Sequence, residues 1–567
     1  MESETTTQQQ SARTVKGRVA IACTECRNQH LRCDAIVPTC SRCRNLRKTC
    51  VYTDLRRSRR RHAGVAKPTH SEHCHEVTNE TRDVPAPLSQ SRATEGARSP
   101  LMQFVPFSHA LSPAMFAESY LLTSRPVDAF YKFFFPGHPF VLPREHLIRQ
   151  SERTPDVSCG LVLMITFIGS VYIHDLFSSE YKLGAEQALN EKLAPNGFNI
   201  QALMLLALTL EWSGENERAA TILEQAKTMG LEIGIQSRGF ASRHGYGEEV
   251  LEESWRRTWW ELYVTDALFA GIRHLPTFTL WGVDADVGIP CEEEQYLRGT
   301  IPQPRTLRDY DDRGFDDNDD DKGFSSYAYL IDATRILGTT LAAGDIANKY
   351  AYSLVGNAEA NLMSWELHLP RSKRDPVQPD GTIDEVLFKA HMTINTTSTH
   401  LHRPRSILHY TTMELLCSKY APPLPAEVLG EEEQHFDRHT HKAINAAKNF
   451  VDLLTASSSP LRHSPFVMCM GSLAVATCLS SCEHILTGTE IVRAKDRVRV
   501  FLGILKAFTA IWSQARHWSG EIKLMAKVVF GQQDEAGQID FTPMHSMVNF
   551  GDTVFPDEAP EGLDNRI

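Results

Sequence analysis

Six cysteines near the start of the chain form a repeated unit, and this repeat constrains the fold more than any other feature of the sequence. They follow the pattern C-x2-C-x6-C-x6-C-x2-C-x6-C and are Cys23, Cys26, Cys33, Cys40, Cys43 and Cys50. The first three recur 17 positions later as the last three. Structural zinc ions are four-coordinate, so six thiolates satisfy two zinc ions if two of the six bridge both metals. The spacing therefore predicts a cluster of two Zn²⁺ ions per chain.

Two other uses of these cysteines fit the sequence less well. Disulfides form in oxidising compartments, but the first ten residues are polar and lack the apolar core of a secretory signal. A single-zinc ribbon needs only four cysteines and would leave two unused. We therefore predict that all six cysteines are metal ligands.

Charge is distributed unevenly along the chain. The formal net charge of the 567 residues is −11. Residues 1–70 hold 15 Lys and Arg against 5 Asp and Glu, a net of +10, so the remaining residues carry −21. A basic arm on an acidic body is typical of proteins that bind nucleic acid through one end.

The segments between the cysteines carry the residues that we expect to contact DNA. Residues 26–33 and 43–50 are each predicted to form a short helix, which fits a major groove, where donors reach guanine N7 and O6. Basic side chains supply phosphate contacts and salt-sensitive affinity, whereas contacts to base edges specify sequence. The candidate contacts are Arg27, Gln29, His30, Arg32, Arg42, Arg44, Arg47, Lys48, Arg56 and Arg57. Double-stranded DNA is the predicted partner.

Composition divides the chain into five predicted regions. They are a disordered N-terminus (1–19), the cysteine domain (20–55), a basic and then disordered linker (56–112), an all-α domain (113–528) and an acidic disordered tail (529–567). Apolar residues recur with helical period in the all-α domain, and alternating strand patterns are scarce. The fold class is therefore mainly α. Residues 200–210 are apolar nearly all round and predict a central buried helix, and Gly230 is expected to end the next one.

The sequence also predicts what the chain does not do. It contains no phosphate-binding glycine loop, no G-x-S-x-G and no H-E-x-x-H, so we expect no enzyme, no catalytic residues and no cofactor besides zinc. The uncharged stretch 465–482 is predicted to be a buried helix rather than a membrane span.

Protein partners are suggested by the tail and the linker. From residue 531 on, eight Asp and Glu stand against a single Arg and are interleaved with aromatic residues, which favours binding to a coactivator. The linker shows no sustained heptads, so we expect any homodimer to form through the helical body.

The cysteine domain resembles the fungal binuclear zinc-cluster (Zn2Cys6) transcription factors. The resemblance covers residues 22–52, with A-C-x-x-C-R-x-x-x-x-R-C-D, a proline at 38 and then C-x-x-C-x6-C-x-Y. It implies that Cys23 and Cys40 bridge the two zinc ions, with Cys26 and Cys33 completing one site. Cys43 and Cys50 would complete the other.

The same resemblance implies recognition of CGG-like triplets from the end of the first helix. Here the stretch departs from the family pattern, because Gln29 and His30 replace two usual cations. His30 stands where a base-reading lysine is common. It can donate a hydrogen bond to guanine N7 but is a weaker cation at neutral pH.

The body resembles the middle homology region of fungal transcription factors. The segments that carry the resemblance are 253–263 (ESWRRTWWELY) with Asp266, 284–290 (DADVGIP) and 401–404 (LHRP). It implies an all-helical regulatory domain. We expect Arg256, Arg257 and Asp266 to form buried or half-buried ion pairs rather than an active site.

These features together predict a nuclear, sequence-specific DNA-binding transcription factor acting with RNA polymerase II. The resemblance suggests that it serves one pathway, such as a secondary-metabolite gene cluster. The alternative is a zinc-scaffolded protein-interaction or co-regulator module without direct base readout, which Gln29 and His30 favour.

Overall fold

The computed structural model describes most of the body of the chain. The described residues are 43, 44, 46, 48, 124–190, 193–313, 323–344, 351–408, 410, 414, 436–456 and 459–534, without the side chains of 351, 352, 436 and 532–534. The predicted N-terminus, linker and most of the acidic tail lie outside them. The chain divides into two compact units, Met1–Met102 and Gln103–Ile567, and the second contains the helical body.

The described part of the body is built of helices, with one isolated β-bridge between Val377 and Ile383. The first half contains α3 (Arg125–Ala129), α4 (Arg144–Arg153), α5 (Pro155–Val171), α6 (Ser178–Asn190), α7 (Gly197–Trp212), α8 (Asn216–Ile233), α9 (Arg238–His244), α10 (Glu249–Ile272), α11 (Glu293–Arg298) and α12 (Leu307–Asp311). The second half contains α13 (Ser326–Ala343), α14 (Ala351–Leu367), α15 (Glu385–His402), α17 (Phe436–Leu454), α18 (Val467–His484), α19 (Thr489–Thr509) and α20 (Ser513–Asp534). Short π and 3₁₀ turns are η2 (Phe130–Phe134), η3 (Phe135–Gly137), η4 (Thr279–Gly282), η5 (Arg371–Lys373), η6 (Arg403–Arg405) and η9 (Pro460–Arg462). The predicted mainly-α class is confirmed.

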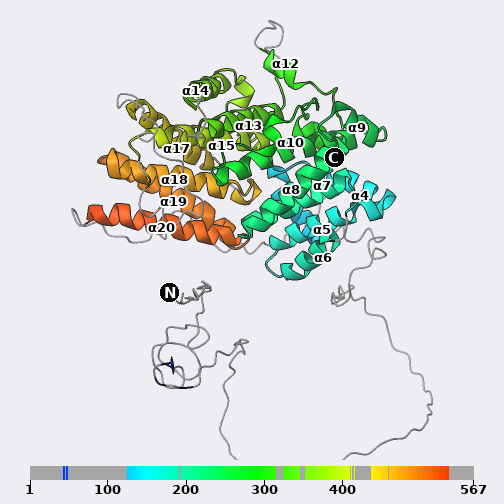
Figure 1. Ribbon diagram of the computed structural model, residues 1–567, viewed down its shortest axis with the longest axis horizontal. Helices are drawn as coiled ribbons and strands as arrows, with labels where there is room; N and C mark the ends of the chain where they lie inside the picture. Colours follow the sequence, from blue (N-terminus) through cyan, green and yellow to red (C-terminus); the bar gives the residue numbers. More distant parts are fainter. Residues whose placement is uncertain are drawn as a thin grey trace, which may run out of the picture. The chain divides into compact units, whose positions relative to one another are not determined.

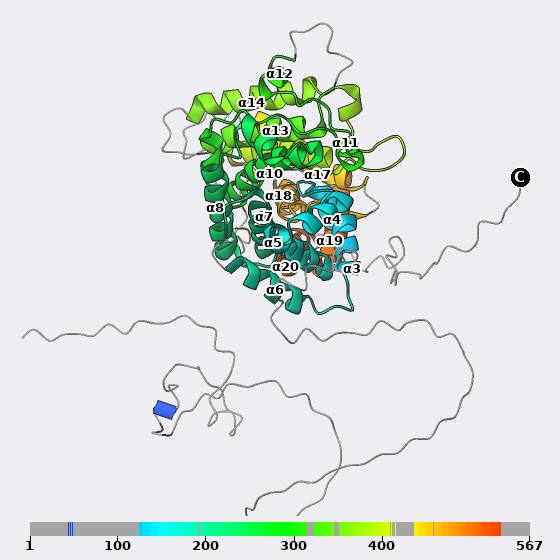
Figure 2. The ribbon, with the colours of Figure 1, turned by 90° about the vertical axis from the view of Figure 1, so that its right-hand side faces the viewer.

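Helices α7 and α10 form the interior of the body. In both ribbon views the order across the body is α14, α13, α10, α7, α5 and α6 (Figure 1, Figure 2). Every residue of α7 is buried, as its apolar sequence predicts. Nearly all of α10 is buried as well, including several charged residues. Charged side chains this deep require partners, and these partners define the rest of the fold.

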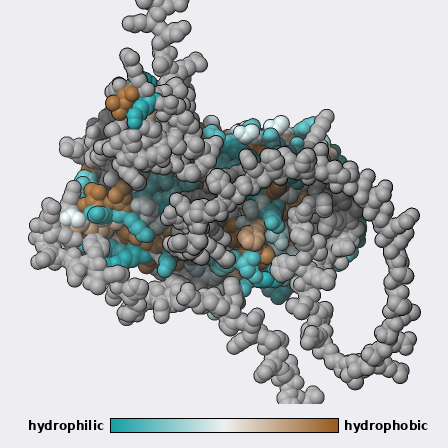
Figure 3. Space-filling view, turned by 90° about the horizontal axis from the view of Figure 1, so that it is seen from below, coloured by the Kyte–Doolittle hydropathy of each residue, from teal (hydrophilic) through white to brown (hydrophobic). Residues whose placement is uncertain are grey.

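The second half of the chain packs through a continuous series of neighbours. Helix α15 contacts α13 and α17, α17 contacts α18, and α18 contacts α19 and α20. The uncharged stretch 465–482 forms most of α18, which is largely buried, as predicted. No helix in the described ranges is long and apolar enough to cross a bilayer. On the face seen in Figure 3, hydrophobic side chains lie in small groups between hydrophilic ones.

Local sequence explains where α7 and α8 begin and end. The side chain of Asn196 accepts a hydrogen bond from the Asn199 amide at 2.9 Å and caps α7. The prediction that Gly230 ends α8 is wrong, since the helix continues to Ile233 and stops at Gly234, whose φ of 74° is left-handed. Gly230 instead lies within the helix, where a Cβ would be 3.4 Å from Leu262 of α10.

Gly169 determines how closely α3 approaches α5. A Cβ at this position would overlap the backbone carbonyl of Pro126, which belongs to α3. Backbone atoms of a packed helix cannot move aside as a flexible side chain can. The contact between α3 and α5 therefore requires glycine here.

We expect Gly169→Ala to lower the free energy of unfolding by about 1–3 kcal/mol, because α3 must move off α5. Gly503→Ala is the matched control, since Gly503 is exposed on α19 with no atom within 4 Å of its Cβ position. That change should raise stability by about 0.5–1 kcal/mol through helix propensity. Urea unfolding of the full chain, followed by circular dichroism, measures the change in unfolding free energy of both variants. Equal changes would contradict the close packing of α3 on α5.

Candidate functional site

Three of the predicted zinc-binding and DNA-contact residues are described. Cys43 and Arg44 lie in a helical turn, and the Lys48 amide donates a hydrogen bond to the Cys43 carbonyl oxygen at 2.9 Å. Cys43 is 1% exposed, whereas Arg44 and Lys48 are both exposed. A buried cysteine and outward cations are what a zinc-held, DNA-facing turn requires.

The other predicted site residues lie outside the described residues. They are the cysteines Cys23, Cys26, Cys33, Cys40 and Cys50 and the candidate contacts Arg27, Gln29, His30, Arg32, Arg42, Arg47, Arg56 and Arg57. Their assignments remain predictions. The donor set nevertheless fits zinc, because thiolates are preferred ligands of structural zinc ions.

A buried charge cluster joins four segments that are far apart in the sequence: residues 137–138, α10, α15 and Ser464. Lys389 of α15 donates to Glu261 of α10 at 2.8 Å and to the Gly137 carbonyl oxygen at 2.8 Å. Nδ1 of His138 lies 2.7 Å from the same carboxylate, and the Ser464 hydroxyl lies 2.9 Å from Nε2. The side chains of His138, Glu261 and Lys389 are at most 1% exposed.

These contacts fix the charge states within the cluster. Burial raises the pKa of Glu261, but the charge of Lys389 and the hydrogen bond from His138 outweigh it and lower this pKa to about 2. Burial and then the charge of Lys389 lower the pKa of His138. A neutral imidazole donates from Nδ1 to Glu261 and accepts from Ser464 at Nε2. The cluster is thus a Lys389–Glu261 ion pair, with a neutral histidine that joins the carboxylate to Ser464.

Arg257, one helical turn before Glu261, makes a second buried connection. Its guanidinium is fully buried and donates to Glu253 at 3.0 Å and to Glu293 at 2.6 Å. It also donates to the carbonyl oxygens of Pro139 and Cys291 at 3.0 and 2.9 Å. One side chain therefore holds α10, the start of α11 and the segment after η3 together.

Arg256 and Asp266, two further charged residues of α10, are paired as the sequence predicted. Arg256 donates to Glu253 at 2.8 Å, and Lys227 of α8 donates to Asp266 at 2.8 Å. Arg256 and Asp266 are 6% and 5% exposed. The expectation that Arg256, Arg257 and Asp266 form buried pairs is confirmed.

Sequence reasoning missed Glu261 and Lys389, because no local motif links residues 128 positions apart.

The 401–404 segment ends α15 with another buried arginine. Arg403 is 1% exposed and donates to Glu414 through two nitrogens at 2.6 and 2.7 Å. Its guanidinium also lies 4.5 Å from the centre of the Tyr410 ring. A planar guanidinium suits this combination of bidentate pairing and stacking. The segment therefore has a structural role.

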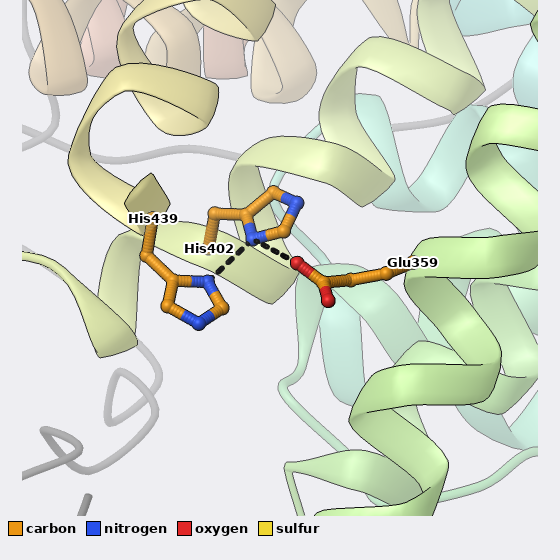
Figure 4. Close-up of side chains that lie close together, drawn as sticks. All are labelled: Glu359, His402 and His439. Carbon is orange, nitrogen blue, oxygen red and sulfur yellow. Dashed lines mark hydrogen bonds and ion pairs between the residues drawn. The ribbon is translucent and has the colours of Figure 1, made fainter. Parts of the chain in front are cut away.

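Two histidines and a glutamate meet where α14, α15 and α17 come together (Figure 4). The Nδ1 atoms of His402 and His439 are 2.7 Å apart, and Nδ1 of His402 lies 3.8 Å from Glu359. Burial, and then the neighbouring His439, lower the pKa of His402 to about 2. At 2.7 Å, one neutral imidazole donates its N–H to the other.

The charges around this trio oppose a divalent metal. Glu359 already pairs with Lys442 at 2.8 Å and with Arg438 at 3.2 Å. With neutral histidines the group carries a net charge of +1, so a divalent cation would be placed beside an excess of positive charge. The trio is better explained as a helix-to-helix contact.

Burial of neutral His402 makes the stability of the body dependent on pH. The pKa of His402 in the folded state is below the unfolded value of about 6.5. The stabilisation that comes from burying the neutral imidazole is therefore complete above pH 6.5. It is lost as pH falls from there toward the folded pKa, by up to about 1.4 kcal/mol per pH unit. In His402→Gln, which cannot titrate, the unfolding free energy should fall less steeply between pH 7.5 and 5.5.

Urea unfolding at several pH values measures this slope. His441→Gln, which alters an exposed residue of α17, serves as the matched control and should keep the wild-type slope. Parallel pH profiles for wild type and His402→Gln would show that the histidine does not contribute in this way.

Comparison with known proteins identifies both parts of the chain. The family model of the fungal Zn(2)-Cys(6) binuclear cluster domain, which binds two zinc ions, matches residues 21–59. The model of the fungal specific transcription factor domain matches residues 127–367. The C6 finger domain transcription factor iacK of Pestalotiopsis fici is 30% identical over 560 residues, covering 92% of this chain and 82% of that protein. No solved structure matches the chain.

A relative of this extent, with both domain matches in the expected places, shows the family. The chain belongs to the fungal Zn(2)-Cys(6) transcription factors, which are DNA-binding regulators of transcription and not enzymes.

Proposed function

We propose that the six cysteines of residues 23–50 hold the two zinc ions and present the first short helix to the major groove at CGG-like sites. The observation that carries the proposal is the exact repeat of the three-cysteine unit within the matched zinc-cluster segment. Cys23 and Cys40 bridge the metals, Cys26 and Cys33 complete one site, and Cys43 and Cys50 complete the other. About 30 residues cannot form a hydrophobic core large enough to fold, and the metals supply the missing stability.

The contacts to DNA divide into two groups with different consequences. Arg27, His30 and Arg32 belong to the helix that reads bases, with Gln29 between them. The cations around the second helix and in the following basic run contact phosphates: Arg42, Arg44, Arg47, Lys48, Arg56 and Arg57. The exposure of Arg44 and Lys48 next to buried Cys43 supports this division.

The biological setting is proposed from the family and the composition. Zinc-cluster transcription factors act in the nucleus, and we place this chain there. We further propose that it regulates the genes of one pathway, such as a secondary-metabolite gene cluster. Binding of a coactivator by the acidic tail and homodimerisation through the helical body remain predictions of the sequence.

The phosphate contacts predict a specific salt dependence. Each neutralised phosphate contributes about −0.9 to the slope of log K against log salt concentration. Lys48→Ala should therefore reduce the slope by about 0.9 and leave the preferred sequence unchanged, whereas Arg27→Ala should change the sequence preference. His30→Lys should increase the slope, because lysine is fully charged at neutral pH. Selection of sites from random DNA by the full chain gives the preferred sequence of each variant. Fluorescence anisotropy with the selected sites gives the salt dependence of binding.

The Arg298→Ala variant is the control for these measurements. It changes an exposed residue of α11 whose guanidinium pairs with Glu294, and it should bind DNA as wild type does.

Zinc analysis of the full chain should give about two ions per molecule. The co-regulator alternative predicts instead that zinc is present but no sequence is selected. Under that alternative Arg27→Ala and Lys48→Ala would have no effect.

A further inference from the structure

The last two helices of the body, α19 and α20, carry an excess of positive charge. They are joined by three residues, 510–512, and pack against each other at the lower left of the body in Figure 1. Together they hold eight Lys and Arg against four Asp and Glu, a net of +4, although residues 71–567 as a whole carry −21. A local charge opposite to that of the surrounding protein favours an acidic partner.

The cations of both helices line the seam between them. On α19, Lys495, Arg499 and Lys506 share one face, because they are four and seven residues apart. The ammonium group of Lys495 lies 4.6 Å from the centre of the Phe530 ring of α20, so this face borders α20. Phe530 in turn shares its face of α20 with the cations 14, 7 and 3 residues before it. The six side chains that form this basic seam are Lys495, Arg499, Lys506, Arg516, Lys523 and Lys527.

Several charges of the basic seam are not used within the fold. Lys506, Lys523 and Lys527 are exposed and form no ion pair with any described residue. Arg499 pairs with the exposed Asp496 of its own helix at 2.8 Å. Three ammonium groups are therefore open to carboxylates from a partner.

Exposed apolar side chains flank the basic seam. Leu524 and Val528 of α20 are 41% and 40% exposed, and each directly follows a lysine of the seam. Val492 of α19 is 56% exposed. The phosphate backbone of a nucleic acid would match the lysines but would gain nothing from these apolar groups. An acidic peptide that also carries large hydrophobic side chains would match both.

The chain itself supplies such a peptide directly after α20. Residues 535–567 contain seven Asp and Glu against one Arg, a net of −6, interleaved with Phe541, Phe550 and Phe555. These 33 residues reach at most about 110 Å when extended, whereas the 22 residues of α20 span about 33 Å. The tail is thus long enough to return along the whole seam. A tethered partner acts at an effective concentration of the order of millimolar, so weak contacts suffice.

We propose that the acidic tail, residues 535–567, docks on the basic seam of its own chain. Its carboxylates pair with the seam lysines, and its hydrophobic side chains lie against Leu524 and Val528. A docked tail is not available to another protein, so the contact would regulate the coactivator binding proposed above. That consequence rests on the proposed function, whereas the docking itself does not.

Cross-linking of the full chain tests where the tail lies. A carbodiimide joins a carboxylate directly to an ammonium group that it contacts, and peptide mapping by mass spectrometry identifies the joined residues. In the monomer we expect cross-links from tail carboxylates to Lys506, Lys523 and Lys527. Lys506 is the most informative, because it lies near the turn into α20, at the opposite end of the helix from the start of the tail.

The double variant Lys523→Glu, Lys527→Glu keeps Lys506 as a reporter. It should reduce the cross-links between Lys506 and the tail about threefold or more, the effect of losing two exposed ion pairs. Adding Asp557→Lys and Glu558→Lys should restore these cross-links, because the charges are then exchanged between the two surfaces.

The matched control is Arg149→Glu, Arg308→Glu. It reverses two exposed cations, on α4 and α12, and gives the same net charge as the Lys523→Glu, Lys527→Glu variant. Its cross-links to Lys506 should equal those of wild type. Both double variants should keep the wild-type melting temperature, since all four side chains are exposed.

Absence of tail cross-links to Lys506 in the monomer would overturn the proposal, as would undiminished cross-linking after Lys523→Glu, Lys527→Glu. Cross-links confined to dimers would overturn it in favour of docking on a second copy. Weaker DNA binding by the same variant, with unchanged cross-links, would overturn it in favour of a DNA contact. Loss of sequence-selective DNA binding in zinc-cluster variants, with intact cross-links, would contradict only the proposed function.

Discussion

Charged groups buried on α10 are the constraint on which the helical body depends. A buried ion costs several kcal/mol unless a partner of opposite charge and further hydrogen bonds compensate it. Glu261 meets this requirement only when Lys389 and His138 arrive from segments 128 and 123 residues away. Arg257 likewise requires Glu293 and the carbonyl oxygen of Pro139. Alternative packings of these helices would leave a charge without its partner, so the pairs select one arrangement.

Helix α15 connects this central cluster to the other polar features of the body. Its first half supplies Lys389 to the cluster, and its last turn supplies His402 to the contact with α14 and α17.

The two parts of the chain differ in what the sequence can reveal. Metal ligands must have a particular residue type and spacing, so the six cysteines are visible without any structure. Helical periodicity likewise identified α7 and the buried character of α18. Gly230 was misinterpreted as a helix end, because its close contact with Leu262 of α10 depends on tertiary packing.

Contacts between residues that are far apart in the sequence could not be predicted from the sequence. The segment 253–263 with Asp266 indicated that Arg257 and Asp266 would form ion pairs, but it did not indicate which residues would be their partners. The pair Glu261–Lys389 had no local signal at all. Thr396 and Thr399 look alike in the sequence, and only the structure shows that one hydroxyl bonds to the backbone while the other does not.

The coupling between Glu261 and Lys389 tests this account most directly. Glu261→Gln, Lys389→Met and the double variant form a cycle whose unfolding free energies can be measured in urea. The account predicts that Lys389→Met costs about 3–5 kcal/mol, because an unpaired carboxylate remains buried. It further predicts that the double variant loses less than the sum of the single variants by about 2–3 kcal/mol. Additive losses within about 0.5 kcal/mol would contradict the claim that this buried pair holds the body together.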